Sequence, residues 1–396
     1  MVYSRHFVND YGANNCHNRA MNYLWQQPKW PDFVYSISNI PNDALYQYSQ
    51  SVGRLSLNLE RTAEDLRVDA VLDLMVKEAV TTSAIEGETL NPDDVRSSLK
   101  NHLGLTHPTI HIRDPRAQGI SALMVTNYRD YESDLTEAVL FQWHRMVLPK
   151  AYDTWGRPLK VGEWRTEGIE VVSGPPHKQK VHFEGPPAER VSEEMVRFFS
   201  WYNRTNPINL SADQIPMIGP VRAAIAHLWF VTIHPFDDGN GRIARALCDH
   251  ALSQDARYPM LHSLSAAIDG RRNEYYEQLE LVQSAEMDIN SWLLWFVEVT
   301  CESVKITERI IDFTLKKASF MKRHQAVLNE RQTQVVLGLF DNGADGDQKS
   351  VNRNKYVNQT NCAPRTALRD LTDLVDKGVL VKLPGLGRNT RYGLNH

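Results

Sequence analysis

Hydrophobic positions recur at helical spacing along most of the chain. Between residues 65 and 85 they share one face, at Val71, Leu74, Met75, Ala79 and Ile85. Apolar residues at every third or fourth position indicate an amphipathic helix. Gly87 suits the position after such a helix, and Asn91-Pro92 suits the cap and first turn of the next one. Patterns of this kind begin near residue 43 and predict a mainly α-helical chain as far as about residue 325.

One segment, residues 165–187, departs from the helical pattern. Residues 169–173 read Ile-Glu-Val-Val-Ser, and residues 181–183 read Val-His-Phe. Between them, Gly174-Pro175-Pro176 suits a turn. The segment therefore predicts a β-hairpin within the helical region.

The last seventy residues have a different pattern. We expect helices at residues 332–340, near 355–359 and from Pro364 onward. A strand at 379–383, a turn at 385–387 and a strand at 390–392 should follow. Three helices followed by a hairpin are typical of the winged-helix fold, a variant of the helix-turn-helix.

The first sixty residues are marked by aromatic side chains between prolines. Trp25, Trp30 and Phe33 alternate with Pro28 and Pro31. Proline disfavours helix in the residue before it, so an extended or turning segment is expected. Its rings should pack against another surface of the protein.

Composition limits the classes of protein that remain. A chain of 396 residues with 42% hydrophobic residues can bury a sizeable core and form two or three domains. The net charge of −4 gives no chain-wide reason to expect binding to nucleic acid or to an anionic membrane. The longest apolar stretch, residues 223–233, is too short to span a bilayer.

Cysteine usage and the N-terminal residues indicate the compartment. Cys16, Cys248, Cys301 and Cys362 lie far apart and form no CxxC pair, so we expect neither disulfides nor structural zinc. Residues 1–10 have no apolar core flanked by basic residues, so no secretory signal is expected. These features predict a soluble cytoplasmic protein with no membrane partner.

The residues best suited to catalysis lie between His234 and Arg245. A nearly all-apolar helix precedes this segment, and another helix begins near Gly241. Glycines at the start of a helix let backbone N–H groups approach an anion closely. Arg242 and Arg245 are three residues apart, so they share a helix face beside that anion site. Guanidinium groups suit phosphate because each can donate two parallel hydrogen bonds.

Two further residues of this segment complete a reactive set. Asp238 is a hard oxygen ligand suited to a Mg²⁺ ion that bridges phosphates. His234 can accept a proton near neutral pH. A base, a metal carboxylate, an anion-binding loop and two arginines together suit attack on a nucleotide phosphate. An ordinary capping loop with a hydrogen-bonded histidine would explain His234 alone, but it explains the whole segment less well.

The segment from His234 to Arg245 resembles the HPFx[D/E]GNGRxxR signature of the Fic family at every fixed position. It reads GNGR rather than the GNxxK-like form of the related Doc kinases, which favours nucleotidyl transfer over phosphoryl transfer. The resemblance extends over about residues 60–300. It implies a Fic-type helical bundle with a β-hairpin flap, and a protein adenylyltransferase that uses Mg-ATP to attach AMP to Ser, Thr or Tyr of a target protein.

The resemblance also implies roles for individual residues. His234 would deprotonate the target hydroxyl, and Asp238 would hold Mg²⁺ on the α- and β-phosphates. Arg242 would bind phosphate and Arg245 would hold the γ-phosphate, whereas Phe236 would be a core anchor without chemistry. The anion hole would be formed by Gly239, Asn240 and Gly241.

Two other segments resemble parts of the same family. The hairpin at 165–187 resembles the Fic flap, which aligns an extended target segment by strand pairing. An ordinary hairpin over the core is the alternative. Residues 272–279 resemble the adenosine-side helix, although aromatic residues at this spacing are often simply core. The expected nucleotide-side residues are Val171, Val172, Ser173 and Gly174 on the flap, and Tyr275, Tyr276 and Gln283 on the helix.

Thr82-Ser-Ala-Ile-Glu86-Gly87 resembles the inhibitory motif [S/T]xxxE[G/N] of the family. It precedes the active-site segment, as in the class with an N-terminal inhibitory helix, here at about residues 65–87. Glu86 at the end of that helix could pair with Arg245 and occupy the γ-phosphate site. A solvated glutamate at a helix end is the alternative.

The resemblances suggest four regions. Residues 1–60 resemble an uncharacterised N-terminal region of many bacterial Fic proteins, and residues 61–300 would be the Fic core. Residues 301–326 would be a linking helix, and residues 327–396 the winged-helix domain.

The residues of the expected winged-helix region suit two kinds of partner, DNA and protein. From Leu328 to the end there are ten basic and seven acidic residues. Lys382, Arg388 and Arg391 could contact DNA phosphates from the wing, and Arg365 and Thr366 lie where a recognition helix would start. Three acidic residues on that helix would repel DNA if they faced it: Asp370, Asp373 and Asp376. DNA binding and protein docking or dimerisation both stay open.

Several functions remain compatible with the sequence. The leading hypothesis is an adenylyltransferase inhibited by its own Glu86, with self-modification and a homodimer as further expectations. A DNA-binding transcriptional regulator with a nucleotide-sensing Fic domain is a rival, although sensing alone would not need His234. A Fic enzyme that uses another nucleotide, or that removes AMP with Glu86 orienting water, is the third hypothesis.

Overall fold

The computed structural model describes residues 2–7, 23–150, 152, 156, 158–175, 178–211, 213–259, 262–284, 286–340, 350–384 and 390–395. Cys16, Pro176, the turn expected at 385–387 and Arg388 lie outside them. The chain forms two compact units, residues 1–62 with 71–307 and residues 63–70 with 308–396. Helices α2 (Glu64–Ile85) and α11 (Asn290–His324) contribute residues to both. The boundary expected at residue 300 falls inside α11.

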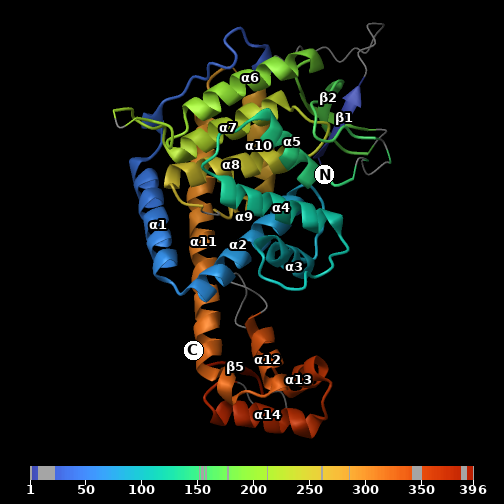
Figure 1. Cartoon of the computed structure of the whole chain (residues 1–396), viewed down its shortest axis with the longest axis vertical. Helices are drawn as coiled ribbons and strands as arrows, with labels where there is room; N and C mark the ends of the chain where they lie inside the picture. The colour runs from blue at the N-terminus through green and yellow to red at the C-terminus, as the bar shows by residue number, and fades with distance from the viewer. Residues whose placement is uncertain are drawn as a thin grey trace. The chain divides into compact units, whose positions relative to one another are not determined.

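The first unit is mainly α-helical, as the sequence predicts (Figure 1). Besides parts of α2 and α11 it contains strands β1 (Val2–Phe7), β2 (Gly168–Ser173) and β3 (Lys180–Glu184). Short 3-10 helices lie at Leu24–Gln26 and Ile37–Asn39. Its other helices are α1 (Asn42–Arg61), α3 (Pro92–Leu103), α4 (Pro115–Asp130), α5 (Glu137–Val147), α6 (Ala188–Arg204), α7 (Gly219–Ile233), α8 (Asn240–Ala256), α9 (Leu264–Gly270) and α10 (Arg272–Gln283).

Local sequence sets where these helices begin and end. Asn91 caps α3 by accepting a hydrogen bond from the Asp93 N–H at 2.8 Å, as its sequence predicts. Asp114 caps α4 in the same way, with the Arg116 N–H at 2.9 Å. Gly87 follows α2 in the left-handed region, with φ 83°, which confirms the predicted helix end.

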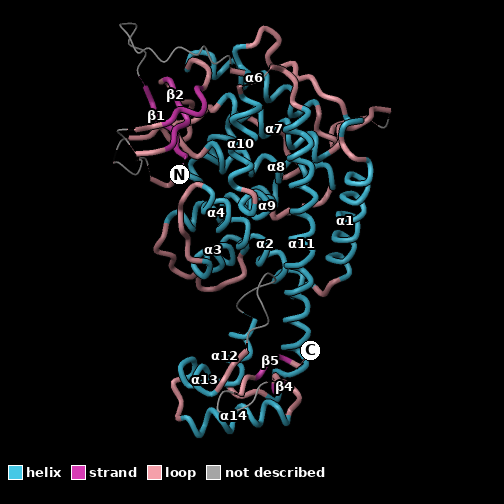
Figure 2. The backbone as a smooth tube through the Cα atoms, turned by 180° about the vertical axis from the view of Figure 1, so that it is seen from behind, coloured by secondary structure: helices cyan, strands magenta, loops and turns pink. Residues whose placement is uncertain are grey.

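The core of this unit is built around α7 and α8, which lie side by side (Figures 1 and 2). Every residue of α7 is buried, because the helix has almost no polar face. The aromatic segment before α1 covers part of it. Trp30 and Phe33 pack edge-on against Trp229 at centroid distances of 6.2 and 5.8 Å, which confirms that these rings pack on another surface.

The predicted hairpin is present and belongs to a three-stranded antiparallel sheet in the order β1-β2-β3 (Figure 2). The strand β1 was not expected from the sequence. It pairs with β2 over six residues, from Val2 opposite Ser173 to Phe7 opposite Gly168. On the other side, β2 pairs with β3 through a register shift between Val171 and Val172. The outer edge of the hairpin is therefore filled by the chain's own N-terminal residues.

The second unit has the expected order of three helices and a hairpin. These are α12 (Glu330–Phe340), α13 (Arg353–Thr360) and α14 (Pro364–Asp376), then β4 (Leu380–Lys382) paired with β5 (Tyr392–Leu394). A 3-10 turn at Gln325–Val327 precedes α12. Its own apolar core includes Tyr356, Leu371 and Leu374.

Two of the three acidic side chains of α14 are engaged inside this unit. Asp370 is buried and accepts hydrogen bonds from Arg331 and from the Tyr356 hydroxyl, both at 3.0 Å. Asp373 accepts from Gln332 at 2.7 Å and pairs with Lys377. The Asp373 side chain is 43% exposed, and Asp376 is exposed. The exposed face of α14 instead carries Arg365, Leu368 and Arg369.

Across the described part of the chain, no helix is long and apolar enough to cross a membrane.

Close packing of α4 on α5 leads to a stability prediction. A Cβ on Gly119 would lie 1.9 Å from the Met146 carbonyl oxygen, a backbone atom that cannot rotate away. Gly119→Ala should therefore lower the free energy of unfolding by about 1–3 kcal/mol, as overpacking does. A Cβ on Gly53, at an exposed position of α1, would have no atom within 4 Å, so Gly53→Ala should stabilise by about 0.5–1 kcal/mol. Denaturant unfolding of both variants tests the contrast, and equal effects would contradict it.

Candidate active site

The loop that joins α7 to α8 carries the predicted reactive residues in a turned backbone. His234 has φ 50° and Gly239 has φ 79°, both in the left-handed region. The Asn240 side chain closes the loop, because it accepts from the Phe236 N–H at 3.1 Å and donates to the Phe236 carbonyl at 2.8 Å. The side chain of Asn240 thus supports the loop, and the backbone N–H groups at the start of α8 are its candidate anion-binding groups.

Two buried residues that sequence reasoning missed hold this loop. His144 on α5 accepts from the Gly162 N–H at 2.9 Å through Nδ1. Its Nε2 must then carry the proton that it donates to the Asp238 carbonyl at 3.1 Å. Burial lowers the pKa of His144 to about 4, in keeping with this neutral form. The ring also stacks on Phe236 at 3.9 Å.

Arg165 joins the loop to the base of the hairpin. Its Nε donates to the His234 carbonyl at 2.8 Å, and Nη2 donates to the Pro186 carbonyl at 2.5 Å. Burial lowers the pKa of Arg165 to about 10, so the side chain is still protonated at neutral pH. Nothing in the sequence around Arg165 indicated this role, because the carbonyl oxygens that it binds at His234 and Pro186 are distant in the chain.

The His234 ring is oriented by its own helix. Its Nδ1 lies 3.2 Å from the Val231 carbonyl, which can only accept a hydrogen bond. In the neutral ring the proton therefore sits on Nδ1 and the lone pair on Nε2. In this tautomer Nε2 is the ring atom that can accept a proton, as general-base chemistry requires.

Arg245 is held by the end of α2. Its Nε donates to Thr82 Oγ1 at 2.8 Å, and its Nη2 donates to the Thr82 carbonyl at 2.9 Å. Nη2 also forms an ion pair with Glu86 Oε1 at 2.7 Å. The pair anticipated from the inhibitory motif is therefore present, with Arg245 1% and Glu86 26% exposed.

The Glu86 carboxylate also lies against the first turn of α8. A Cβ on Gly241 would come within 2.2 Å of Glu86 Oε1. A side chain at position 241 would therefore push the carboxylate out of its present place. Glu86 therefore occupies space directly over the helix start that the sequence assigns to an anion.

Each of the two arginines has one buried nitrogen that makes no hydrogen bond within the part of the chain that the structure describes. Among the described residues, Arg242 Nε and Arg245 Nη1 are buried without a hydrogen-bond partner. A buried guanidinium donor without an acceptor is costly, and a phosphate oxygen would satisfy it. These two donors without acceptors fit an anionic ligand that has several oxygens.

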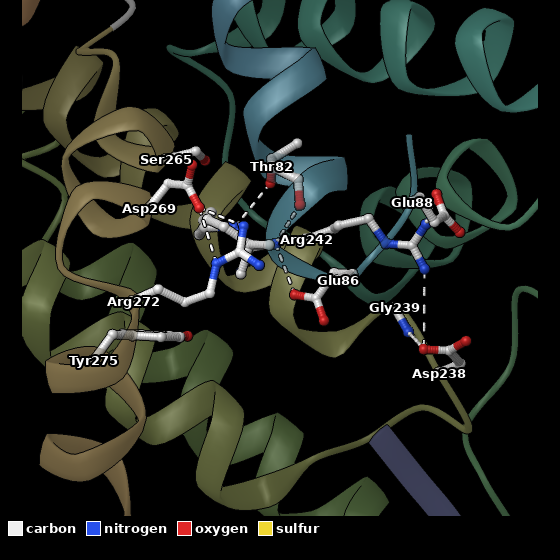
Figure 3. Close-up of polar contacts among 12 residues, drawn as sticks. Thr82, Glu86, Glu88, Asp238, Gly239, Arg242, Ser265, Asp269, Arg272 and Tyr275 are labelled. Carbon is white, nitrogen blue, oxygen red and sulfur yellow. Dashed lines mark hydrogen bonds and ion pairs between the residues drawn. The ribbon is translucent and has the colours of Figure 1, made fainter. Parts of the chain in front are cut away.

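Arg242 has an acidic neighbour that the sequence analysis did not single out. Its Nη1 donates to Glu88 Oε2 at 3.0 Å, and its Nη2 lies 3.9 Å from Asp238 Oδ1 (Figure 3). Glu88 lies two residues after Glu86 in the turn that ends α2. The Glu-Gly-Glu sequence of that turn was the available signal.

Asp238 is the candidate metal ligand of the loop. Its side chain is 49% exposed, and Oδ1 accepts from the Gly239 N–H at 2.6 Å. The neighbouring Asp237 is engaged elsewhere, with the Lys160 N–H at 2.9 Å. The residues that the structure describes contain no cluster of three or more His, Cys, Asp or Glu suited to a metal. One exposed carboxylate beside phosphate-binding groups still fits Mg²⁺, which commonly takes one or two carboxylates plus substrate phosphates.

The predicted flap residues lie in β2 and just after it. Val172 is fully buried, whereas Val171 and Ser173 are partly exposed. Ser173 Oγ lies 2.6 Å from His182 Nε2, and His182 Nδ1 lies 2.7 Å from Glu280 on α10. Gly174 follows with φ 95°. The hairpin is thus tied to α10, and the predicted nucleotide contacts of these residues stay predictions.

The three candidates on α10 all lie near α7 or α2. Tyr275 is buried with its hydroxyl 3.2 Å from His227 Nε2. The Tyr276 hydroxyl donates to the Ile85 carbonyl at 3.4 Å. Gln283 is buried and donates to Thr232 Oγ1 at 3.3 Å. These contacts give each side chain a structural role, and nucleotide contact is untested.

Two parts of the chain match the profiles of known protein families. Residues 134–252 match the profile of the Fic/DOC family. Residues 23–105 match a domain of unknown function, DUF4172, which spans the aromatic segment and α1 to α3. The second match includes Glu86 and Glu88.

Curated relatives share about a quarter of their residues with this chain. A protein adenylyltransferase Fic of Culex quinquefasciatus is 27% identical over 266 residues, 65% of this chain and 45% of the relative. A protein adenylyltransferase fic-1 of Caenorhabditis elegans is 27% identical over 214 residues, 52% and 36% of the two chains. A uridine 5'-monophosphate transferase of Xanthomonas campestris pv. campestris (strain 8004) is 29% identical over 135 residues, 34% and 24%. This chain spans less than half the length of these relatives.

A solved structure shares the fold. A Fic family protein from Desulfovibrio desulfuricans G20 superposes with a TM-score of 0.51 at 17% identity, over 92% of this chain and 98% of the other. This similarity concerns the fold, and the profile match identifies residues 134–252, which contain the segment from His234 to Arg245, as a Fic/DOC family domain.

Proposed function

We propose that this chain is a protein adenylyltransferase that transfers AMP from Mg-ATP to a Ser, Thr or Tyr hydroxyl of a target protein, and that Glu86 inhibits it. The observation that carries the proposal is the pair of buried, unpartnered guanidinium donors on the helix that begins beside His234. They require an anion with several oxygens, next to a base. The names of the relatives from Culex quinquefasciatus and Caenorhabditis elegans support the same reaction.

The proposed reaction transfers one proton and exchanges one O–P bond for another. His234 Nε2 takes the proton of the target hydroxyl, and the hydroxyl oxygen attacks the α-phosphorus of ATP. A new O–P bond forms to AMP, the bond to the β-phosphate bridging oxygen breaks, and pyrophosphate leaves. Arg242, Arg245 and the N–H groups of Gly239, Asn240 and Gly241 would stabilise the phosphate charge. Asp238 would hold Mg²⁺, which neutralises charge on the phosphates when bound.

Inhibition by Glu86 follows from competition for one guanidinium. A γ-phosphate that reaches Arg245 must replace the carboxylate already bound there at 2.7 Å. A nucleotide that leaves its γ-phosphate elsewhere would present the α-phosphorus at a different angle to the hydroxyl. In-line attack needs close alignment, so the penalty should fall on the rate in addition to the affinity that the missing γ-phosphate contact costs.

A target that presents its hydroxyl in an extended segment suits the flap. Strand β1 pairs antiparallel with this edge of β2 over six residues, so the edge is compatible with an added strand. Strand addition supplies affinity from main-chain hydrogen bonds, with little demand on side-chain sequence. A target segment at this edge would take the place of β1.

The identity of the nucleotide is the least constrained part of the proposal. The relative from Xanthomonas campestris is named for transfer of uridine 5'-monophosphate, so family membership alone does not choose the base. We favour ATP because relatives covering more of this chain are named adenylyltransferases. Mass spectrometry of lysate incubated with the protein and each isotope-labelled nucleoside triphosphate separately would identify both the transferred group and the target.

A second function, DNA binding by the unit after residue 308 as a winged helix, is favoured by the face of α14. Of the acidic residues that would repel DNA, Asp370 is buried, and the charge of the partly exposed Asp373 is offset by its ion pair with Lys377. Arg365 and Arg369 lie one helical turn apart on the exposed face, with Arg369 75% exposed. Lys382 and Arg391 of the hairpin are also exposed. This arrangement suits contact with duplex phosphates.

The base assignment predicts a specific defect. His234→Ala should reduce AMP transfer by about 10²–10⁴-fold and leave ATP affinity nearly unchanged, because the base acts on the hydroxyl and not on the nucleotide. Incorporation of labelled ATP into target protein and calorimetric titration of ATP measure the two properties. His102→Ala, at an exposed position of α3, is the matched control. Transfer at the parental rate by His234→Ala would remove the histidine from the mechanism.

The inhibitory assignment predicts a gain of activity. Glu86→Gly should raise transfer at least about tenfold if only 1.4 kcal/mol of the Arg245 interaction is released in the transition state. Glu86→Gly combined with Arg245→Ala should lose that gain, because the freed site has no ligand for the γ-phosphate. Melting temperatures of the same preparations detect a glutamate that only stabilises the helix end. A folded Glu86→Gly protein with no gain on a competent target would refute inhibition.

DNA binding by α14 predicts a salt-dependent loss. Arg365→Ala/Arg369→Ala should weaken binding to mixed-sequence duplexes, and the slope of log affinity against log salt should fall by about two. Lys322→Ala/Arg323→Ala removes the same charge from exposed positions of α11 and should change binding less. Fluorescence anisotropy across salt concentrations measures both. No salt-sensitive binding by the parental protein would favour a protein-docking role for this unit.

A further inference from the structure

The turn that ends α2 delivers two glutamates to two different arginines. The Gly87 N–H donates to the Ala84 carbonyl and the Glu88 N–H to the Ser83 carbonyl, both at 2.9 Å. With Gly87 at φ 83°, these bonds form a Schellman motif, which fixes the backbone on both sides of the glycine. Glu86 then meets Arg245, and Glu88 meets Arg242.

The two arginines differ in what their partners leave available. On Arg245, both Nε and Nη2 are engaged, by Thr82 and Glu86, so one complete edge of the guanidinium is filled. On Arg242, the contact with Glu88 uses Nη1 alone. Arg242 Nε has no partner among the described residues, and Nη2 is 3.9 Å from Asp238, beyond hydrogen-bond distance. The Nε–Nη2 edge of Arg242 can therefore still receive a bidentate oxyanion.

We propose that Glu88 is a positioning residue that anchors Arg242 at Nη1 and so presents its Nε–Nη2 edge to a nucleotide phosphate. This inference rests on the proposed function of the site as a nucleotide site. It gives the two glutamates of one turn opposite effects: Glu86 blocks the Nε–Nη2 edge of Arg245, whereas Glu88 orients the same edge of Arg242 toward phosphate.

Burial explains why Arg242 needs an anchor. The side chain of Arg242 is 4% exposed, and a buried cation without a carboxylate partner is unfavourable. A long side chain held at one end of its guanidinium also loses less rotamer freedom when phosphate binds. Glu88 is 27% exposed and fixed by the Schellman motif, so it can hold Arg242 without filling the remaining edge.

Hydrogen bonding and charge can be separated by two substitutions. Gln at position 88 keeps an oxygen that accepts from Arg242 Nη1 but has no charge, whereas Ala keeps neither. Loss of a negative charge near a phosphate site should by itself tighten anion binding. Positioning therefore predicts that the two variants differ in direction, which a purely electrostatic or purely structural role of Glu88 does not predict.

The test is calorimetric titration of the full chain with Mg-ADP. ADP has no γ-phosphate to compete with Glu86, so its affinity reports on Arg242. Glu88→Ala should weaken Mg-ADP binding about threefold to tenfold, and Glu88→Gln should bind at least as tightly as the parental chain. In an Arg242→Ala background, Glu88→Ala should have no further effect. Glu60→Gln, at an exposed position of α1, controls for the change in net charge.

Each alternative gives a different result. Tighter binding by both Glu88→Ala and Glu88→Gln would make Glu88 a second inhibitory group and overturn the proposal. Unchanged affinity in both variants, with a lowered melting temperature, would reduce Glu88 to a stabilising contact and also overturn it. A parental chain that binds neither Mg-ADP nor Mg-ATP would overturn the nucleotide site itself. Binding without any transfer would overturn only the proposed reaction and leave this inference standing.

Discussion

The structure around the candidate site depends on two nearly buried guanidinium groups and on the acceptors that pair with them. Arg245 and Arg242 are 1% and 4% exposed, and a buried cation is stable only beside groups that accept its hydrogen bonds. The end of α2 supplies two of these groups, Glu86 and Glu88. Removing α2 would leave both arginines with further unpaired donors, so the helix is a structural part of the site as well as a candidate regulator.

Other contacts in the first unit hold α2 and the loop after α7 in place. Glu78, earlier on α2, is buried and accepts hydrogen bonds from the N–H of Ser265 and from its hydroxyl at the start of α9. Burial raises the pKa of Glu78, although the bonds from Ser265 oppose the shift. His144 and Arg165 hold the loop itself, through the carbonyl groups of Asp238 and His234. These contacts involve no predicted catalytic atom.

Sequence predicted the parts of the site that depend on local pattern. The helix end at Gly87, the hairpin at 165–187 and the segment from His234 to Arg245 all follow from patterns within a few residues. Partners distant in sequence were not predictable in this way. Arg165 binds carbonyls about twenty and seventy residues away, which leave no side-chain signal. Strand β1 was missed because its six residues, Val-Tyr-Ser-Arg-His-Phe, alternate only weakly and gain a partner only from the folded hairpin. Glu88 was missed because the inhibitory motif ends at Gly87.

The central claim is that the Glu86 carboxylate holds the position of a γ-phosphate on Arg245. Calorimetric affinities for Mg-ATP and Mg-ADP, compared within each protein, test it without a target or a transfer assay. We expect the parental chain to bind the two nucleotides within about twofold of each other, and Glu86→Gly to bind ATP at least about tenfold more tightly than ADP, since a charge-assisted contact is then gained. A parental chain that already prefers ATP by that factor, or a folded Glu86→Gly protein that still does not distinguish the two, would contradict it.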